Sequence, residues 1–600
     1  MKRPEITRRQ FLKGAAFGTV TAAAMGILGP SAFAEGAQTE EKAGSVPAEY
    51  EVYKTQLLII GTGMAATFAC QRALQEGKQI MMVDKGVFRH SGAAGMSWDA
   101  WMLWWDYCAF RHPGWMLIDD NISQSAYTYL QGENGFNPWV ESINHGQTLV
   151  WRDENGMPKP ETDALPWSVV SSFYRREMDD IIESGKVEVM DQTMVTNLLI
   201  NKGRCIGVMG LHLPTGKLRV IRADAVIDSS SGCTQFHGWL SIGYRGINSS
   251  EATGDVAMAA FRKGAHIGEA EFAQYDYNSI IYKDVAHTFG LGIGADAGEL
   301  EILYDANHER IFSDEEIPEV NGNLGMSQKI GRLVFEEGKG TENDGVFVAY
   351  DEESFKTVRY PIMRNVSFFQ EHGYDPIGRF TEVAAEMYEH GGAPVIDKNM
   401  MTEFEGLFNS RGAGACGENG GPHCMHNRLY GHYTGHCACE YLDKAEPIDE
   451  ESIDWSSVEE EFLRLHELRT RKVEGGLRPW EIRRKIQAAG YRGFTIYRST
   501  EMMEEAIAEL ERIRKEDMPK QVLADDSVVF NVDWKTAIEN INILDNAEVS
   551  IRASLLREET RGAYLRPEFP EKDDENWNCM LACHLEDGEM VFEKRPYPAL

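Results

Sequence analysis

The residues whose spacing points most clearly to chemistry lie near the start of the chain, where GTGMAA occupies positions 61–66. Gly61 permits a tight turn, and Gly63 lets a pyrophosphate group approach the backbone. Asp84 follows 23 residues after Gly61, where a carboxylate is placed to accept a ribose hydroxyl. This spacing predicts a dinucleotide site. The contacts that we expect in it come from Gly61, Gly63, Met64, Ala65, Asp84 and Lys85.

Three elements must hold this turn in place. The apolar run QLLII at 56–60 is typical of a fully buried parallel strand. A helix is expected from the turn to about Gly77, with its N-terminal amides facing the phosphates. QIMMV at 79–83 predicts a second strand that leads to the acid. Because strand, turn, helix, strand and acid follow in register, we prefer the dinucleotide site to the alternative, an ordinary βαβ unit.

A run of small residues after the second strand distinguishes between dinucleotides. FRHSGAAGMS at 88–97 lets the chain pass close to a flat ring, which NAD enzymes do not need at this place. KLRVIRADAVID at 217–228, followed by SSSG, resembles the hairpin and strand of two-dinucleotide-type flavoproteins. Both features indicate FAD. The further cofactor contacts that we expect come from His90, Ser91, Gly92, Ala94, Gly95 and Met96.

The first 34 residues have the pattern of an export signal. TRRQFLK at 7–13 carries a paired arginine, an apolar run extends over 15–28, and AFA at 32–34 forms a cleavage site. A membrane anchor is the alternative, but the run is shorter than the ~20 apolar residues of a spanning helix. We therefore expect a twin-arginine signal, a periplasmic or extracytoplasmic protein, and no integral membrane segment after cleavage. This pathway is usual for proteins that acquire a cofactor before export.

Composition excludes several classes of function. The chain has 94 acidic and 60 basic residues, and its net charge of -34 repels nucleic acid and anionic lipid. Its length predicts two to four domains of ~100–200 residues each. Ten cysteines occur without CxxC, CxxCH or zinc spacing, so we expect no metal, haem or iron-sulfur cluster in the chain itself. Cys437, Cys439, Cys579 and Cys583 are interpreted as core or loop thiols, with a disulfide as the alternative.

Motifs along the rest of the chain resemble those of one flavoprotein superfamily. SEATGDVAMA at 250–259 is similar to T-G-D-G-x-A-M-A, and EF with the glutamine at 274 is similar to E-F-x-Q. LREETRGAY at 556–564 with DDENW at 573–577 is the most specific match. From residue 52 onward, the chain thus resembles the flavoprotein subunits of succinate dehydrogenase, fumarate reductase, aspartate oxidase and adenylylsulfate reductase. The other matching segments are 406–418 and 427–431.

The resemblance implies an α/β fold. A Rossmann-like FAD-binding domain of the two-dinucleotide-binding type would be interrupted by an α+β capping domain and followed by a C-terminal helical domain. WEIRRKIQ at 480–487 fits a helix of the last domain, with Ile482 and Ile486 one turn apart. The expected divisions are 1–34 for the signal, 35–51 for a linker, 52–262 and 393–445 for the FAD-binding domain, 263–392 for the capping domain, 446–545 for the helical domain and 546–600 for a C-terminal extension.

The resemblance also implies cofactor and substrate contacts. Asp255 lies in the T-G-D-G match, and Glu418 takes the place of the acid that holds the ribityl chain. Arg428 keeps the position of the carboxylate-binding arginine. In succinate dehydrogenases a histidine of R-S-H-T is bonded to the flavin, whereas here the order is RHS at 89–91. We therefore expect noncovalent FAD, with attachment at His90 as the alternative.

Several histidines are candidates for proton transfer. His423 and His426 lie close to Arg428 in a segment interpreted as a glycine-rich loop, together with His432 and His436. His390 in EHGG resembles the substrate-binding turn H-x-x-G-G of the family. Because a histidine can donate a proton near neutral pH, the catalytic candidates are Arg428, His426, His423 and His390. A solvent-facing or backbone-bonded histidine is the alternative for each.

Two departures from the family pattern bear on the substrate. Ala297 falls where fumarate reductases carry a proton-donating arginine, and Gln328 replaces the arginine of S-R-x-I. We therefore expect an exported, FAD-dependent reductase of anaerobic respiration, acting on an unsaturated organic acid or enone and not on fumarate. Electrons would come from an iron-sulfur or cytochrome partner. The alternatives are a catalytic subunit like that of adenylylsulfate reductase, a flavin electron-relay subunit without a substrate, and the reverse reaction.

Overall fold

The structure is a computed structural model of the 600-residue chain. It describes residues 50–88, 178, 181–238, 249–279, 302–317, 322–349, 370, 373–411, 424–448 and 453–596. The side chains of His426 and Arg428 lie outside this description, although their backbone is included. The other expectations that lie outside it concern the signal peptide, His90, Ser91, Gly92, Ala94, Gly95, Met96, Ala297, Glu418 and His423.

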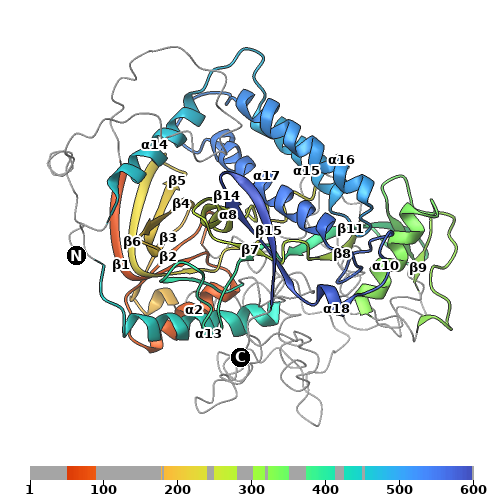
Figure 1. Ribbon diagram of the computed structural model, residues 1–600, viewed down its shortest axis with the longest axis horizontal. Coiled ribbons are helices and arrows are strands. Elements are labelled where there is room, and N and C mark those ends of the chain that lie inside the picture. The colour runs from red at the N-terminus through yellow and green to blue at the C-terminus, as the bar shows by residue number, and fades with distance from the viewer. Residues whose placement is uncertain are drawn as a thin grey trace, which may run out of the picture.

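A sheet of seven described strands carries the predicted dinucleotide turn (Figure 1). Its strand order is β3-β2-β1-β6-β5-β4, and β13 also pairs with β6. The predicted strand at 56–60 is the second half of β1, which runs parallel to β2 and to β6. β6 pairs antiparallel with β5, which confirms the expected hairpin. The strands are β1 (Tyr50–Ile60), β2 (Ile80–Val83), β3 (Val187–Met190), β4 (Thr193–Asn201), β5 (Arg204–His212), β6 (Lys217–Asp228) and β13 (Leu407–Asn409).

Two helices cross beside this sheet, α2 (Met64–Gln75) and α13 (Cys424–Leu442) (Figure 1). The expectation of a glycine-rich loop around Arg428 is wrong, because the chain is helical from Cys424 onward. Its glycines make room for the crossing. A Cβ atom at Gly431 would lie 2.2 Å from the carbonyl oxygen of Ala65, and one at Gly435 would lie 2.7 Å from that of Ala69.

Two further sheets follow the first. The sheet of the capping region has the strand order β8-β11-β10-β9, all antiparallel. A third sheet, β12-β7-β14-β15, joins the C-terminal hairpin to the region where the FAD-binding and capping domains were expected to meet. The bounds are β7 (Ile267–Gly268), β8 (Ala273–Ser279), β9 (Leu303–Tyr304), β10 (Val346–Ala349), β11 (Phe380–His390), β12 (Ala393–Pro394), β14 (Met580–Glu586) and β15 (Glu589–Arg595).

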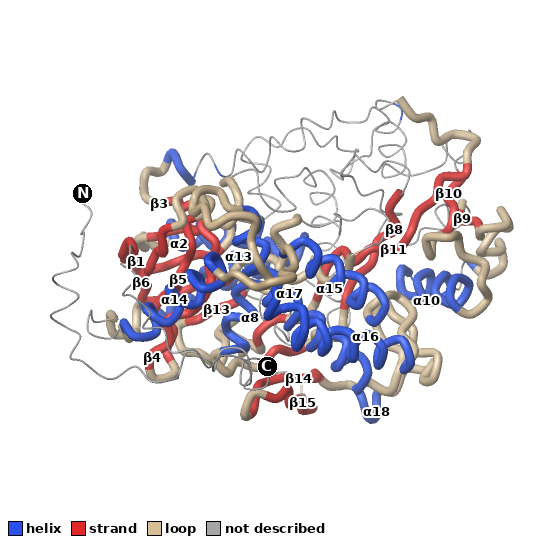
Figure 2. The backbone as a smooth tube through the Cα atoms, turned by 90° about the horizontal axis from the view of Figure 1, so that it is seen from above, coloured by secondary structure: helices blue, strands red, loops and turns tan. Residues whose placement is uncertain are grey.

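Long helices lie between the first sheet and the capping sheet (Figure 2). The helix predicted around residues 480–487 is confirmed as α15, and Ile482 and Ile486 are fully buried in it. The boundary expected after residue 545 falls inside α17, which continues to Leu556 and is buried over most of its length. The helices are α8 (Asp255–Arg262), α10 (Gly322–Phe335), α14 (Trp455–Thr470), α15 (Pro479–Gly493), α16 (Thr500–Arg512), α17 (Val532–Leu556) and α18 (Asp574–Trp577), with short turns at Ile513–Asp517 and Met518–Lys520.

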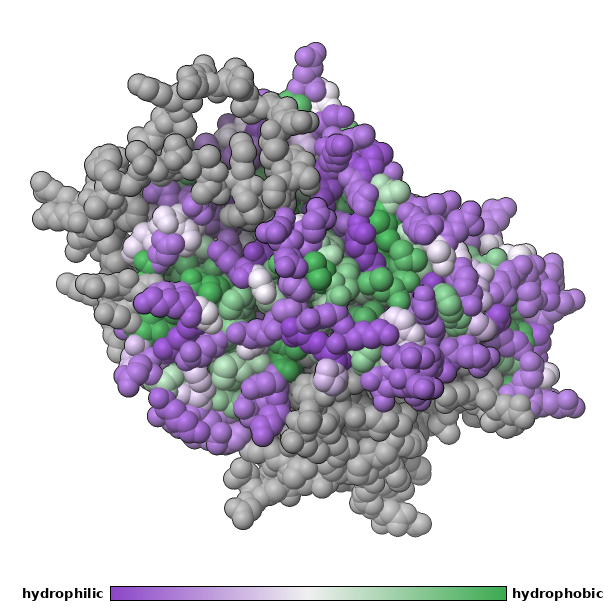
Figure 3. Space-filling view, viewed as in Figure 1, coloured by the Kyte–Doolittle hydropathy of each residue, from purple (hydrophilic) through white to green (hydrophobic). Residues whose placement is uncertain are grey.

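Hydrophilic residues cover much of the described surface in Figure 3, with hydrophobic residues gathered in patches between them. Within the part of the chain that the structure describes, no helix combines the length and the apolar character needed to cross a membrane. The described cysteines are free thiols, and Cys437, Cys439 and Cys583 are buried, which agrees with the interpretation as core thiols.

We predict that Gly431→Ala lowers the melting temperature, because the added methyl group would collide with the backbone of α2. Overpacking of this kind costs about 1–3 kcal/mol. Thermal unfolding followed by circular dichroism measures the effect. Gly331→Ala in α10 is the matched control, since the nearest atom to its added Cβ would be 3.6 Å away. This control should be neutral or more stable by about 0.5–1 kcal/mol; equal losses in both variants would contradict the crossing.

Candidate active site

The predicted glycine turn lies where the parallel strands end. Gly61 follows β1, Asp84 follows β2, Ser229 follows β6 and Ser410 follows β13, so four strand ends meet at one edge of the sheet. Gly61 has a φ of +92°, and a Cβ atom there would lie 2.8 Å from the carbonyl oxygen of Ser229. A residue with a side chain would therefore be strained at this position and would collide with the backbone that follows β6.

The N-terminus of α2 is open to a ligand. Gly63 is its N-cap, and among the residues that the structure describes no side chain caps this end and no atom would lie within 4 Å of a Cβ atom at Gly63. Met64 and Ala65 begin the helix directly after it. A helix N-terminus that shows its backbone to an open space suits a pyrophosphate group, so this cradle fits a dinucleotide.

Asp84 stands at the predicted position but already supports the turn. Its Oδ2 accepts hydrogen bonds from the amide (2.8 Å) and hydroxyl (2.6 Å) of Thr62, and its Oδ1 accepts one from the amide of Gly86 (2.7 Å). A carboxylate has about four acceptor sites, and at least three of those on Asp84 support the turn. Its contact with a ribose hydroxyl stays a prediction.

Lys85, the next predicted contact, lies in a buried cluster of charges. Its Nζ donates hydrogen bonds to Thr253 (2.6 Å), Asp255 (2.8 Å) and Glu539 (2.9 Å). Asp255 also accepts a hydrogen bond from Asn542 of α17 (2.7 Å). Lys85 and Asp255, both predicted from sequence to contact the cofactor, thus tie the strand edge to α17, and a direct contact with the cofactor stays a prediction.

The ionised form of each residue in this cluster is stabilised by its neighbours. Burial opposes the charged form of Lys85, but Asp255, Glu539 and a third carboxylate, Glu251, hold its pKa above the usual range. Burial likewise opposes the charged form of Glu539, whose pKa is held below its usual range by Lys85 and other cations. The contribution of the acid is lost only at low pH and that of the lysine only at high pH, so the cluster is intact at neutral pH.

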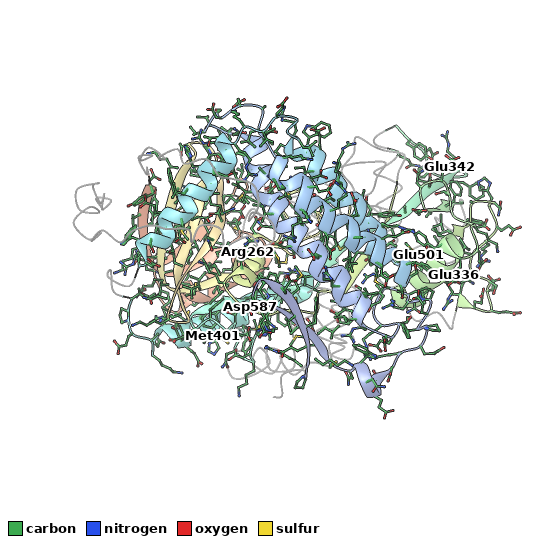
Figure 4. All side chains as sticks on the ribbon, turned by 45° about the horizontal axis from the view of Figure 1, so that its top comes forward. Arg262, Glu336, Glu342, Met401, Glu501 and Asp587 are labelled. Atoms are coloured by element: carbon green, nitrogen blue, oxygen red, sulfur yellow. The ribbon has the colours of Figure 1, made fainter. Side chains whose placement is uncertain are left out.

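The same helix is fixed to α8 by a second set of contacts. Figure 4 shows Arg262 at the end of α8, against α17. Its guanidinium donates to Asp545 (2.8 Å) and to Asn542 (2.7 Å). Because Asn542 also donates to Asp255, the two sets share a residue and hold α8 and α17 in one relative position.

Asp228 is a buried acid at the strand edge that our sequence analysis did not single out. Its Oδ1 accepts from the amide (2.9 Å) and hydroxyl (2.6 Å) of Ser230, and its Oδ2 accepts from Asn409 at the end of β13 (2.9 Å). Burial raises the pKa of Asp228 to about 6, although the Ser230 hydrogen bonds and the Arg411 charge oppose the rise. An acid that ends an apolar strand, as in AVID, is the sequence signal that could have found it.

His390 is fixed at the end of β11 and is fully buried. Its Nε2 lies 3.1 Å from the carbonyl oxygen of Ala270 and 2.8 Å from the hydroxyl of Ser550 on α17. Since a carbonyl only accepts, Nε2 carries the hydrogen, and Nδ1 is then an acceptor in the neutral ring. Burial, with the charge of Arg411, lowers the pKa of His390 to about 3. A ring in this state is a poor proton donor at neutral pH.

The remaining predicted residues lie on α13. Gly431 of α13 lies against Ala65, so the first turns of α13, which include Arg428, lie close to the N-terminus of α2. Burial of His432 lowers its pKa to about 3. Nδ1 of His436 lies 3.3 Å from Nη2 of Arg72 on α2. His432 and His436 therefore follow the helix and its crossing and do not belong to a loop.

Residues of two motifs meet in the interior. Glu271 of the E-F-x-Q match accepts hydrogen bonds from Arg557 of the C-terminal match, and both side chains are fully buried. Arg557 also donates to Glu559 (2.8 Å). These motif residues connect the start of the capping region to the C-terminal segment, so they support the site from outside it.

Comparisons with known proteins agree with this geometry. A model of the FAD binding domain family matches residues 166–479, which is more than half of the chain. A model of the fumarate reductase flavoprotein C-terminal domain matches residues 483–598. The chain is 26% identical over 503 residues to the fumarate reductase flavoprotein subunit of Mycobacterium tuberculosis, covering 79% of this chain and 82% of that protein. It is 26% identical over 456 residues to the succinate dehydrogenase flavoprotein subunit of Rickettsia conorii, covering 72% and 73%.

Two solved structures show the same fold. The E. coli quinol fumarate reductase aligns with a TM-score of 0.75 at 21% identity, covering 92% of this chain and 97% of that chain. The adenylylsulfate reductase of Archaeoglobus fulgidus aligns with a TM-score of 0.67 at 16% identity, covering 92% and 97%. The predicted α/β fold with a C-terminal helical domain is confirmed, and the cofactor is FAD.

We predict that Lys85→Met lowers the melting temperature and the amount of FAD that copurifies. The change leaves Asp255 buried without its lysine, whereas Glu539 keeps Arg483 at 3.0 Å and Lys535 at 3.1 Å. Breaking a buried pair costs about 3–5 kcal/mol, and the two remaining cations place the expected loss at or below the lower end of this range. Arg492→Met is the control, because Arg492 pairs with Glu505 on the surface, with side chains 48% and 55% exposed. Such pairs contribute about 0–1 kcal/mol. If both variants have the same melting temperature, the Lys85 cluster does not hold the domains together.

We also predict a pH dependence from Asp228. Its pKa is about 6 in the folded protein and about 3.9 in an unfolded chain. Between these values the folded state keeps a proton that the unfolded state has released, so this carboxyl destabilises the protein as pH rises. Relative to wild type, Asp228→Asn should therefore gain melting temperature between pH 4 and 7, whereas Asp443→Asn, at an exposed site, should not. If the melting temperatures of wild type and Asp228→Asn change with pH in parallel, this prediction is refuted.

Proposed function

Because the chain belongs to the FAD binding domain family and is an FAD-dependent oxidoreductase of the fumarate reductase and succinate dehydrogenase flavoprotein type, we propose that it reduces an unsaturated organic acid or enone other than fumarate. Bound FAD supplies hydride transfer to a carbon–carbon double bond. The protein binds and orients the substrate and stabilises the charge that develops on it.

The residues divide this task by position. The glycine turn at Gly61 and Gly63, with the N-terminus of α2, holds the pyrophosphate, and Asp84 takes a ribose hydroxyl. Arg428, at the start of α13 beside that N-terminus, binds a substrate carboxylate or carbonyl oxygen. His390 lies at the end of the capping sheet, where its neutral imidazole adds no positive charge to the site.

The observation that carries the proposal is Gln328. It lies half-buried on α10, where the family motif S-R-x-I has an arginine. Fumarate carries two carboxylates, and each is best matched by a cation with a fork of donors. The neutral state of His390 removes another source of positive charge. A substrate with one carboxylate, or with a ketone, needs only Arg428.

Export and an electron donor are parts of the same proposal. The twin-arginine pattern at 7–13 supports an extracytoplasmic place for the protein, and insertion of FAD before export gives a reason for this route. The names of the relatives describe them as flavoprotein subunits, which supports the existence of a partner chain. An iron-sulfur protein or cytochrome would deliver the electrons.

A second candidate is a catalytic subunit like that of adenylylsulfate reductase. The end of the chain after Trp577, through EDGEMVFEKRPY at 586–597, resembles adenylylsulfate reductase more than succinate dehydrogenase. It contains the hairpin β14–β15, whose strand β14 pairs with β7 in the third sheet. Adenylylsulfate is made in the cytoplasm, whereas the signal pattern favours export, so we place this candidate second. A flavin relay without a substrate is the third.

The test is anaerobic oxidation of reduced methyl viologen by purified, FAD-loaded protein, offered fumarate, adenylylsulfate, trans-cinnamate or 4-phenyl-3-buten-2-one. We expect turnover with cinnamate or the enone, and a kcat/KM for fumarate at least about tenfold lower, equivalent to 1.36 kcal/mol in the barrier. Arg428→Met should reduce turnover of cinnamate more than Arg428→Lys does. Turnover of fumarate at an equal rate would refute the proposal. Turnover of adenylylsulfate would favour the second candidate. If no compound is turned over although the flavin can be reduced, the electron-relay subunit is favoured.

A further inference from the structure

A second buried histidine, His237, has no hydrogen-bonding partner for either ring nitrogen among the residues that the structure describes. It is 2% exposed. A neutral imidazole has one donor and one acceptor, and leaving such a group unpaired in the interior destabilises the folded protein. An unpaired buried polar group in a folded protein calls for an explanation, and a ligand that pairs with it is one.

The backbone fixes the ring of His237 in place. The amide of His237 donates to the carbonyl of Thr234 (3.2 Å), and the side chain of Gln487 on α15 donates to the carbonyl of Gln235 (3.1 Å). A Cβ atom at Gly490 would lie 2.0 Å from the carbonyl oxygen of Phe236, so this turn is pressed onto α15. The unpaired nitrogens are therefore not the result of a loosely held loop.

Aromatic residues surround the imidazole of His237, but their polar atoms serve other partners. Its ring centre lies 5.6 Å from that of Tyr275 on β8 and 5.2 Å from that of Tyr491 on α15. The Tyr275 hydroxyl donates to the carbonyl of Phe494 (2.6 Å), and the Tyr491 hydroxyl donates to Asp344 (3.0 Å). The two phenol rings meet the imidazole at steep interplanar angles, 64° for Tyr275 and 54° for Tyr491, and make apolar contact with it.

His237 lies where three parts of the molecule meet. It follows β6 of the FAD-binding sheet, Tyr275 begins the capping sheet, and Tyr491 belongs to the helical domain. Its neighbour Phe236 packs edge-on against the ring of His390 at 5.1 Å. Nδ1 of His390 also lacks a partner among the described residues. His237, next to Phe236 in sequence, and His390, in ring contact with Phe236, thus each have at least one nitrogen without a partner among the described residues.

The charge state of His237 restricts what it can bind. Burial, together with the nearby guanidinium of Arg498, lowers the pKa of His237 to about 3. The ring is neutral at physiological pH, so it attracts an uncharged oxygen by donating one N–H and adds no positive charge for a carboxylate.

We propose that His237 donates a hydrogen bond to the carbonyl oxygen of a flat, aryl-substituted enone or acrylate bound among Phe236, Tyr275 and Tyr491. This inference rests on the proposed function and narrows its substrate class. His237 holds the substrate carbonyl and polarises the double bond, while the imidazole stays neutral.

Binding to the oxidised, FAD-loaded protein tests the inference without turnover. The probe is 4-phenyl-3-buten-2-one, and the change in flavin absorbance gives its Kd. We expect His237→Phe to raise this Kd about tenfold, which corresponds to 1.4 kcal/mol, and His237→Gln to retain most of the affinity because it keeps a donor. His584→Phe is the matched control: Nδ1 of His584 is also buried without a partner among the described residues, but it lies on β14 of the third sheet.

Thermal stability provides a second readout. If the nitrogens of His237 are unpaired in the free protein, His237→Phe should melt at the same temperature as wild type or higher, because it removes two unpaired polar atoms. A loss of melting temperature would show a structural role and overturn the inference, as would an unchanged Kd or an absence of any enone signal in wild type. If enone binding depends on His237 but no acceptor oxidises viologen, the inference stands and the proposed reductase activity fails.

Discussion

The buried contact between Lys85 and Glu539 is the interaction on which the arrangement of this molecule depends. It joins the end of β2, beside the dinucleotide turn, to α17 at the centre of the helical domain. A buried ion pair adds little stability over an apolar contact of the same volume, but its geometry is directional. The cluster therefore fixes where α17 lies relative to the FAD-binding sheet.

The same helix carries this position to the capping sheet. Asn542 contacts Asp255, Ser550 contacts His390, and Ser554 accepts a hydrogen bond from the buried Arg498. Asn542, Ser550 and Ser554 are eight and four positions apart, which are multiples of about one helical turn, so they share one face of α17. One rigid helix thus sets the distance between the cofactor end of the site and its substrate end.

Local patterns were sufficient to predict the dinucleotide unit. The run before Gly61, the glycine turn and Asp84 lie within one βαβ unit, where each choice of residue is dictated by neighbours in sequence. The helix α13 was not predicted, because Gly431 suggests a loop until its contact with Ala65 is known. Pairs such as Glu271 and Arg557 were recognised as motifs, but their partnership depends on a fold that brings distant segments together.

The candidate site was predicted in part for the same reason. Its glycines have a local signature, whereas the protonation state of His390 and the unpaired ring of His237 follow from burial, which no short motif encodes. Asp228 was missed because, directly before SSSG, it resembles a turn residue. The neutral histidines add no cation to those of Arg411 and Arg498 nearby, and Gln328 replaces a further arginine of the family motif, which is the physical reason to expect a substrate with fewer carboxylates than fumarate.

The most direct measurement of this account is the rate at which 4-phenyl-3-buten-2-one reoxidises the reduced flavin of the purified protein under anaerobic conditions, followed by stopped-flow absorbance. The account predicts rapid, enone-dependent reoxidation of FAD and, with fumarate at the same concentration, a rate at least about tenfold lower. Reoxidation by fumarate at an equal rate, or by neither compound, would contradict it.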